Sequence, residues 1–255
     1  MLTVLLSSFA LVAVVLTVTA LVARRLGRVV VVDLVWGLGF VLVALLCALI
    51  GESPLRWVLF GMVAVWGLRL AWHVGRRVFA TSEEDPRYAA MLDGKPFSFA
   101  VKRVFLTQGI AMWFVSLPVQ VAAGSDGQTE DILLALGLVL WLVGLVFESV
   151  GDAQLAAYKQ DPDRGPVMDR GLWRFTRHPN YFGDACVWWG IFLVAVAATP
   201  WALLTVLSPV VMTYFLVFAT GAKLLERSMM KRPGYPEYAA RTSMFFPLPP
   251  RQPAR

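Results

Sequence analysis

The densest group of chemically active side chains lies in the stretch GLWRFTRHPNYFGD, residues 171–184. Arg174, Arg177 and His178 fall within five residues, and Asn180 and Asp184 follow shortly after. Guanidinium groups bind phosphates and carboxylates through paired hydrogen bonds, and an amide or a carboxylate can orient a polar ligand. The proline after His178 stands where a helix can begin, because the first helical residue needs no N–H. We therefore expect a ligand site at a helix start.

Asp33 is a carboxylate that stands inside an apolar segment, in VDLVWG. A charged side chain in such a segment must face protein or water rather than lipid. Trp36 and Phe40 share its face of a helix, which would suit a flat apolar ligand. The structural alternative is a helix cap or an ion pair with one of three nearby arginines, Arg24, Arg25 or Arg28.

A second polar face follows in a later apolar segment. Arg69, His73 and Arg76 stand at i, i+4 and i+7, so they share one side of a helix, and Arg77 extends the group. Anchoring at a membrane surface explains Arg76 and Arg77 equally well. It does not explain Arg69, which lies deeper in the segment.

A third polar face combines Glu148, Asp152 and Lys159, with Gln154 and Tyr158 beside it. Two acids near the end of a membrane helix are not expected to face lipid. They could pair with arginines of the neighbouring connection, or hydrogen-bond the hydroxyl or amide groups of a polar cofactor. Both roles are compatible.

The elements that position these residues follow from composition. Of 255 residues, 58% are hydrophobic and 16% are charged, whereas soluble domains have about 45–50% and about 25%. Apolar segments lie at 2–23, 29–50, 55–75, 104–123, 132–157, 181–198 and 201–222. Each approaches the roughly 20 residues that a bilayer requires. The sequence predicts an all-α integral membrane protein with seven transmembrane helices.

The net charge of +6 comes from lysine and arginine in alternate connections between the apolar segments. Lysine and arginine gather in the first, third and fifth connections and in the tail, whereas 51–54, 124–131 and 199–200 contain none. The positive-inside rule therefore predicts a cytoplasmic C-terminus and an N-terminus outside. Topology accounts for the basic excess, so we expect no nucleic-acid partner. Membrane lipids are the expected surroundings.

Three smaller features complete the pattern. Pro118 predicts a kink in the fourth segment, and the proline-rich tail at 247–253 predicts an extended chain. Cys47 and Cys186 are single cysteines within apolar runs, and the two histidines lie far apart. Neither a disulfide framework nor a metal site is supported.

Several motifs together resemble the bacterial relatives of steroid 5α-reductases. They are VDLVWG at 32–37, WGLRL at 66–70, EDPRY at 84–88, Glu148 with Asp152 and Gln154, and the stretch at 171–184. LER at 225–227 and the segment at 233–247 fit the same family, so the resemblance covers nearly the whole chain. RHPNY alone is less specific, because sterol reductases and isoprenylcysteine-type membrane methyltransferases carry similar sequences.

The resemblance implies a seven-helix reductase of a bacterial-type inner or plasma membrane. It would take NADPH from the cytoplasmic side and transfer hydride to a conjugated C=C bond in a steroid or other lipid. Residues 1–123 would form the substrate-side helices and 132–247 the cofactor-binding core of a single membrane domain. The sequence has no G-x-G-x-x-G after a strand, so the cofactor would lie between helices.

Residue roles carry over by position. Asp33 matches a glutamate that, with a tyrosine, holds the substrate carbonyl and stabilises the enolate. Trp66 stands where that tyrosine is expected, and its indole cannot supply a hydroxyl. Arg69 would border cofactor and substrate, so the implied catalytic residues are Asp33, Trp66 and Arg69. The implied cofactor-binding residues are Arg69, Arg76, Arg77, Glu148, Asp152, Lys159, Arg170, Arg174, Arg177, His178, Asn180, Tyr181, Asp184, Lys223 and Glu226.

Two alternatives stay open. An S-adenosylmethionine-dependent lipid or isoprenylcysteine methyltransferase is favoured by RHPNY and by Glu226 with Tyr235, but it leaves Asp33, Arg69 and EDPRY without a role. A non-enzymatic membrane protein with a vestigial pocket is favoured by Trp66, and by Asp184 where a glutamate is usual.

Overall fold

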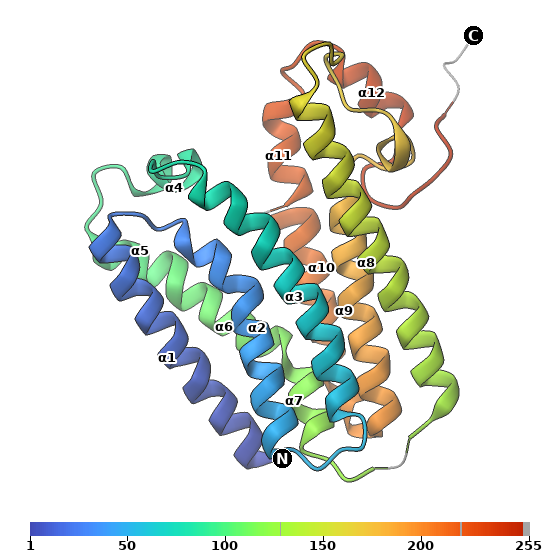
Figure 1. Ribbon diagram of the computed structural model, residues 1–255. Helices are drawn as coiled ribbons and strands as arrows, with labels where there is room; N and C mark the ends of the chain where they lie inside the picture. The colour runs from blue at the N-terminus through green and yellow to red at the C-terminus, as the bar shows by residue number, and fades with distance from the viewer. Residues whose placement is uncertain (128, 220, 252–255) are drawn as a thin grey trace. The chain divides into compact units, whose positions relative to one another are not determined.

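The computed structural model describes residues 1–127, 129–219 and 221–251. Over these residues the regular structure is helical, and the one isolated bridge joins Thr176 to Ser243 (Figure 1). The chain divides into two compact units. Unit 1 comprises Met1–Leu134 and Ile191–Ser208, and unit 2 comprises Ala135–Gly190 and Pro209–Arg255.

Six helical stretches in the described residues are long and apolar enough to cross a membrane. They are Leu2–Leu26, Val31–Ile50, Arg56–Phe79, Asp131–Gln160, Pro179–Ala198 and the composite Pro200–Met229. A seventh arises if Phe97–Val115 and Leu117–Ala123, bent by 44° at the break between them, count as one span. The all-α, multi-pass character is confirmed, and the predicted number of seven requires counting the bent pair.

The bend has a local cause at Ser116. Pro118 lies in the first turn of the helix that follows, where its missing N–H is tolerated. The Ser116 hydroxyl donates to the carbonyl oxygen of Met112 at 2.8 Å and to that of Trp113 at 3.0 Å. A side-chain hydroxyl thus satisfies acceptors at the break. The kink predicted from Pro118 is present.

Unit 1 is built on three long helices, α1 (Leu2–Leu26), α2 (Val31–Ile50) and α3 (Arg56–Phe79), with α2 packed against both others (Figure 1). α2 and α3 approach closely at two glycines, because a Cβ at Gly37 would lie 2.5 Å from the Gly67 carbonyl oxygen. Phe40 and Trp66 are buried beside this crossing. The unit also contains the shorter helices α4 (Pro86–Leu92), α5 (Phe97–Ala100), α6 (Thr107–Val115) and α7 (Leu117–Ala123), with a π-helical turn at Val101–Leu106. Its second segment adds the end of α9 (Pro179–Ala198) and the 3₁₀ helix η3 (Pro200–Thr205).

Unit 2 is built on α8 (Asp131–Gln160) and the first half of α9 (Pro179–Ala198). These helices touch backbone to backbone, since a Cβ at Gly144 would lie 2.5 Å from the Gly183 carbonyl oxygen. The contact brings the acids of α8 beside the first turns of α9. The remaining elements are η2 (Gly171–Arg174), α10 (Leu207–Tyr214), the π-helical η4 (Phe215–Ala219), α11 (Ala222–Met229) and α12 (Tyr235–Arg241).

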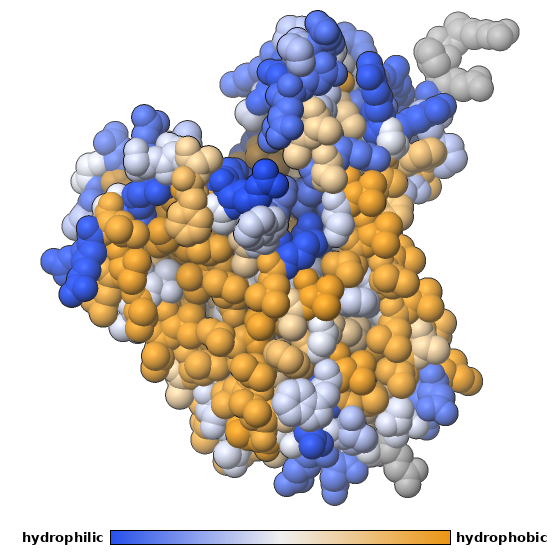
Figure 2. Space-filling view, in the orientation of Figure 1, coloured by the Kyte–Doolittle hydropathy of each residue, from blue (hydrophilic) through white to orange (hydrophobic). Residues whose placement is uncertain are grey.

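Both units expose apolar surface along their long helices. Leu6, Phe9 and Val14 of α1 are exposed, as are Leu136 and Val139 of α8. In Figure 2 this surface is orange, and blue polar residues gather at the ends of the helices. Exposed apolar residues gathered along long helices mark a surface that contacts a membrane or another protein. With the spans above, they define a multi-pass membrane protein.

Candidate functional site

The first polar cluster surrounds Asp33, in the first turn of α2. The Tyr88 hydroxyl donates to Asp33 Oδ1 at 2.6 Å, and Arg87 Nη2 donates to Asp33 Oδ2 at 3.0 Å. Arg77 Nη2 lies 3.9 Å from the same Oδ2. The Asp33 side chain is 17% exposed. A largely covered carboxylate is therefore held by two cations and one neutral phenol.

The EDPRY motif explains how the partners of Asp33 are positioned. Glu84 accepts hydrogen bonds from the backbone N–H groups of Val29 and Val30, which satisfies donors at the start of α2. Asp85 is the N-cap of α4 and accepts from the Arg87 N–H at 2.9 Å. Pro86 then opens α4. The first two motif residues fix two helix starts, so Arg87 and Tyr88 project from a defined turn.

Electrostatics in this cluster favours a protonated phenol. Burial raises the pKa of Tyr88, and the negative charge of Asp33 raises it further. The hydrogen bond from Arg87 lowers the pKa of Asp85. The cluster therefore holds a neutral hydroxyl beside ionised Asp85 and a guanidinium, a combination that can donate a hydrogen bond to a carbonyl oxygen.

The other predicted residues of unit 1 lie on α3. Trp66 is fully buried, and its ring centroid lies 5.7 Å from that of Phe40, so it packs in the core. Arg69 is half-buried, whereas Arg76 and Arg77 are exposed. Of these, the structure brings Arg77 near Asp33.

The second polar cluster lies between α8 and α9 in unit 2. Glu148 and Asp152 are buried, as predicted for acids that avoid lipid, and so is Asp184. Asn180 Nδ2 donates to Asp152 Oδ1 at 3.1 Å. This bond orients the Asn180 amide, whose carbonyl oxygen is then the atom suited to accept from a ligand carboxamide.

The short helix η2 (Gly171–Arg174) is hydrogen-bonded to α8 on either side of Asp152. Trp173 Nε1 donates to the Gly151 carbonyl oxygen at 3.0 Å, and the Leu172 N–H donates to Gln154 Oε1 at 3.0 Å. Gly171 has φ 57°, and a Cβ there would clash with the Gln154 side chain. Gly171, Trp173 and Gln154 thus serve to position the loop.

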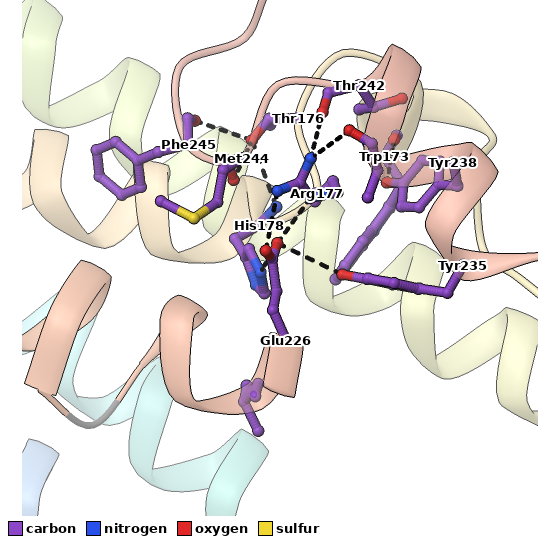
Figure 3. Close-up of polar contacts among 12 residues, drawn as sticks. Trp173, Thr176, Arg177, His178, Glu226, Tyr235, Tyr238, Thr242, Met244 and Phe245 are labelled. Carbon is purple, nitrogen blue, oxygen red and sulfur yellow. Dashed lines mark hydrogen bonds and ion pairs between the residues drawn. The ribbon is translucent and has the colours of Figure 1, made fainter. Parts of the chain in front are cut away.

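Arg177 is the centre of a third polar cluster (Figure 3). Its Nε and Nη2 donate to the two carboxylate oxygens of Glu226 at 2.6 and 2.9 Å, a bidentate pair. Its Nη1 donates to the carbonyl oxygens of Ala239 and Thr242 at 2.8 and 2.6 Å. Burial lowers the pKa of Arg177, but the hydrogen bonds and charge of Glu226 outweigh it, so the pKa is raised. Arg177 is a permanent cation that joins three segments.

His178 and Tyr235 complete the surroundings of Glu226. His178 Nε2 lies 3.1 Å from Glu226 Oε1, and the Tyr235 hydroxyl lies 3.5 Å from the same oxygen (Figure 3). The Tyr181 ring stacks on His178 with centroids 5.4 Å apart. Glu226 of α11 is therefore the common partner of two residues just before α9 and of Tyr235 at the start of α12.

The C-terminal segment has no helix or strand over residues 247–251, and residues 243–248 are docked on the loop before α9. Thr176 Oγ1 donates to the Phe245 carbonyl oxygen at 2.8 Å, and the Arg177 N–H donates to the Ser243 carbonyl oxygen at 2.9 Å. The Leu248 N–H donates to the Phe175 carbonyl oxygen at 3.0 Å. Residues 252 and 253 of the predicted tail lie outside the described residues.

Several of the predicted cofactor residues of unit 2 are hydrogen-bonded to acids, and four others are exposed. Asn180 meets Asp152, and Arg177 meets Glu226. Lys159 and Lys223 are exposed, and Lys223 Nζ lies 5.5 Å from the centre of the Phe218 ring. Arg170 and Arg174 are exposed on an open hollow.

Sequence reasoning assigned no role to Tyr88, Arg87, Tyr238 or the tail arginines Arg241 and Arg251. One signal could have found Tyr88. Asp33 opens the second span, so it lies at the same membrane face as the connection after the third span, which carries EDPRY. The tail contacts use backbone carbonyl groups, and these leave no side-chain signature.

A family model described as a protein of unknown function (DUF1295) matches residues 19–242. The chain therefore belongs to this family. Neither a curated protein nor a solved structure gives a match to the chain.

Proposed function

We propose that the protein is a membrane-embedded, NADPH-dependent reductase of a C=C bond conjugated to a carbonyl group in a steroid or other lipid. The observation that carries the proposal is the 2.6 Å hydrogen bond from the Tyr88 hydroxyl to Asp33. The resemblance to relatives of steroid 5α-reductases requires a carboxylate paired with a tyrosine. Trp66 cannot provide the hydroxyl, but Tyr88 can.

The chemistry asked of this pair is stabilisation of negative charge. A bound NADPH, with its nicotinamide held by Asn180, would supply hydride to the β-carbon of the enone. The C=C electron pair then shifts toward the carbonyl oxygen, and a solvent proton completes the α-carbon. A phenol has one hydrogen to donate, so the substrate oxygen would take the Tyr88 hydrogen bond in place of Asp33. Arg87 would keep the Asp33 charge balanced.

The residues of unit 2 fit a dinucleotide. Asn180, held by Asp152, offers its amide to the nicotinamide carboxamide. The connection after α8 encloses a hollow of about 240 Å³. Tyr158, Val167 and Tyr238 give this hollow aromatic and apolar walls. Its charged lining is three arginines and two aspartates, Arg164, Arg170, Arg241, Asp161 and Asp169, with a net positive charge. Such a lining suits adenosine and its phosphates. We place this end of the chain in the cytoplasm, with the N-terminus outside, on the distribution of lysine and arginine.

One observation favours a second function, S-adenosylmethionine-dependent methyl transfer. Arg177, His178, Glu226 and Tyr235, which carry the resemblance to membrane methyltransferases, meet in a single network. Thermal unfolding of the protein in detergent separates the two functions, because a ligand that binds only the folded state raises its stability. We expect NADPH to raise the unfolding temperature. A rise with S-adenosylmethionine and none with NADPH would establish the alternative, and no rise with either would favour a non-enzymatic protein.

Asn180→Ala is expected to weaken NADPH binding by about tenfold, the effect of losing one hydrogen bond of about 1.4 kcal/mol. The measurement is the concentration of NADPH that gives half of the maximal thermal shift. Ser228→Ala, on the exposed side of α11, is the matched control and should leave this concentration unchanged. An Asn180→Ala protein with wild-type NADPH affinity would remove Asn180 from the cofactor site.

A further inference from the structure

A second, larger hollow of about 650 Å³ opens beside the tail in unit 2. Its charged lining consists of four arginines and one aspartate: Arg170, Arg174, Arg241, Arg251 and Asp169. Its lining includes neither Asn180 nor Asp152. Arg174 and Arg251 line this hollow and not the one assigned to adenosine. The two hollows share Asp169, Arg170 and Arg241, and the arginine hollow extends from this common wall to Arg174 and the tail.

The hollow is built by hydrogen bonds that fix its walls. The Arg251 N–H donates to the Arg241 carbonyl oxygen at 2.8 Å, which brings the end of the tail back to α12. Arg241 Nη2 pairs with Asp169 Oδ2 at 2.5 Å, which ties α12 to the loop before η2. Two segments distant in sequence thus present their guanidinium groups to the same space.

The charge balance of this space calls for an anion. Asp169 pairs with Arg241, and within the part of the chain that the structure describes the other three exposed guanidinium groups leave this space with a net positive charge that attracts anions. Guanidinium groups match phosphate oxygens in geometry as well as charge. The chemistry of the hollow is that of a phosphate site.

Exposed apolar residues stand close in sequence to the lining residues Arg174 and Pro250. Phe246 is 65% exposed, and Phe175 and Leu248, joined by their backbone hydrogen bond, are also exposed. The Phe246 ring lies 6.2 Å from that of Phe182, in the first turn of the span α9. Exposed aromatic and aliphatic groups beside basic residues at the mouth of a span are typical of a membrane interface. These apolar groups distinguish a lipid from a soluble phosphate.

We propose that the arginine hollow binds the phosphate-bearing headgroup of an acidic phospholipid, with Phe175, Phe246 and Leu248 in the interfacial layer. The tail then acts as a lipid-binding strap that joins α12 to the membrane beside α9. Of these two hollows Arg251 lines only the arginine hollow, so a change at Arg251 tests lipid binding separately from the adenosine site.

The test is native mass spectrometry of the detergent-solubilised full chain with added phosphatidylglycerol or phosphatidylcholine of identical acyl chains. We expect the wild type to bind phosphatidylglycerol more tightly. Arg251→Glu should reduce that affinity by roughly fivefold or more, from the contribution of one basic residue near an anionic surface. Arg251→Lys keeps the charge and should retain most of it. Arg232→Glu, an exposed arginine outside the hollow, is the matched control.

Thermal stabilisation by NADPH is measured on the same proteins. The proposal requires Arg251→Glu to lose its preference for phosphatidylglycerol while it keeps the wild-type response to NADPH. Equal affinity of the wild type for both lipids would overturn it. A loss of NADPH response in Arg251→Glu with lipid preference intact would assign the hollow to the cofactor instead. Absence of any NADPH response in the wild type concerns the reductase proposal alone.

Discussion

Tyr88→Phe is expected to lower kcat for reduction of an enone lipid by about 10²–10³-fold, the usual effect of removing one donor to a developing oxyanion. KM should change little, because a neutral carbonyl oxygen in the ground state gains less from the donor than the enolate does. The measurement is steady-state NADPH oxidation by the protein in lipid nanodiscs. Tyr214→Phe, which alters an exposed tyrosine of α10, is the control and should keep wild-type kcat.

The pH profile gives a second readout of Tyr88. The reaction needs the protonated phenol, and burial together with the charge of Asp33 raises its pKa. The donor therefore remains available past the ordinary tyrosine pKa of about 10. Because the neutral form is the one favoured in the fold, its contribution to stability is complete below that value and is lost as pH rises through the raised pKa. A Tyr88→Phe protein with undiminished kcat would show that the phenol takes no part.

Glu226→Ala is expected to lower the free energy of unfolding by about 3–5 kcal/mol, the cost of leaving a buried charge without its partner. The Arg177 and Glu226 side chains are only 11% and 13% exposed. The Glu226 carboxylate also contacts His178 Nε2 at 3.1 Å. The measurement is denaturant unfolding in mixed micelles. Lys223→Ala, one turn earlier on α11 and exposed, is the matched control and should cost less than about 0.5 kcal/mol.

A double variant shows how much of the loss in unfolding free energy comes from leaving Arg177 or Glu226 without its charged partner. Arg177→Met with Glu226→Leu removes both charges and fills similar volume, so it should recover part of the loss seen in Glu226→Ala. Arg177→Met alone should be as harmful as Glu226→Ala. If neither single variant changes the unfolding free energy, the network of Figure 3 does not hold the tail and α11 to the loop.

The membrane architecture could be predicted because it depends on local quantities. Segment length and hydropathy located every span, and Pro118 located the bend. The burial of Glu148 and Asp152 followed from the cost of placing acids in lipid. The close approach of α8 to α9 could not be predicted from the sequence. It depends on Gly144 facing Gly183, and the sequence does not show which residues of the two helices lie opposite each other.

The candidate site could be predicted only in part. Asp33 was identified, but its hydroxyl partner was expected from α3, where Trp66 proves to be a core residue. Tyr88 reaches Asp33 because Glu84 and Asp85 cap two different helices, a tertiary arrangement that residue spacing does not encode. Arg177 was expected at a phosphate, and the structure gives it Glu226 and two carbonyl groups. Its acceptors are backbone atoms and a residue 49 positions away.

The central claim is hydride transfer, and isotope transfer tests it most directly. The protein in nanodiscs is incubated with NADPH carrying deuterium at both C4 positions, together with a mixture of steroid and isoprenoid enones. Mass spectrometry of the lipids then locates the label. The reductase proposal predicts one deuterium at the β-carbon of a saturated ketone, and none with Tyr88→Phe over the same interval. A protein that binds NADPH yet leaves every enone unlabelled would contradict it.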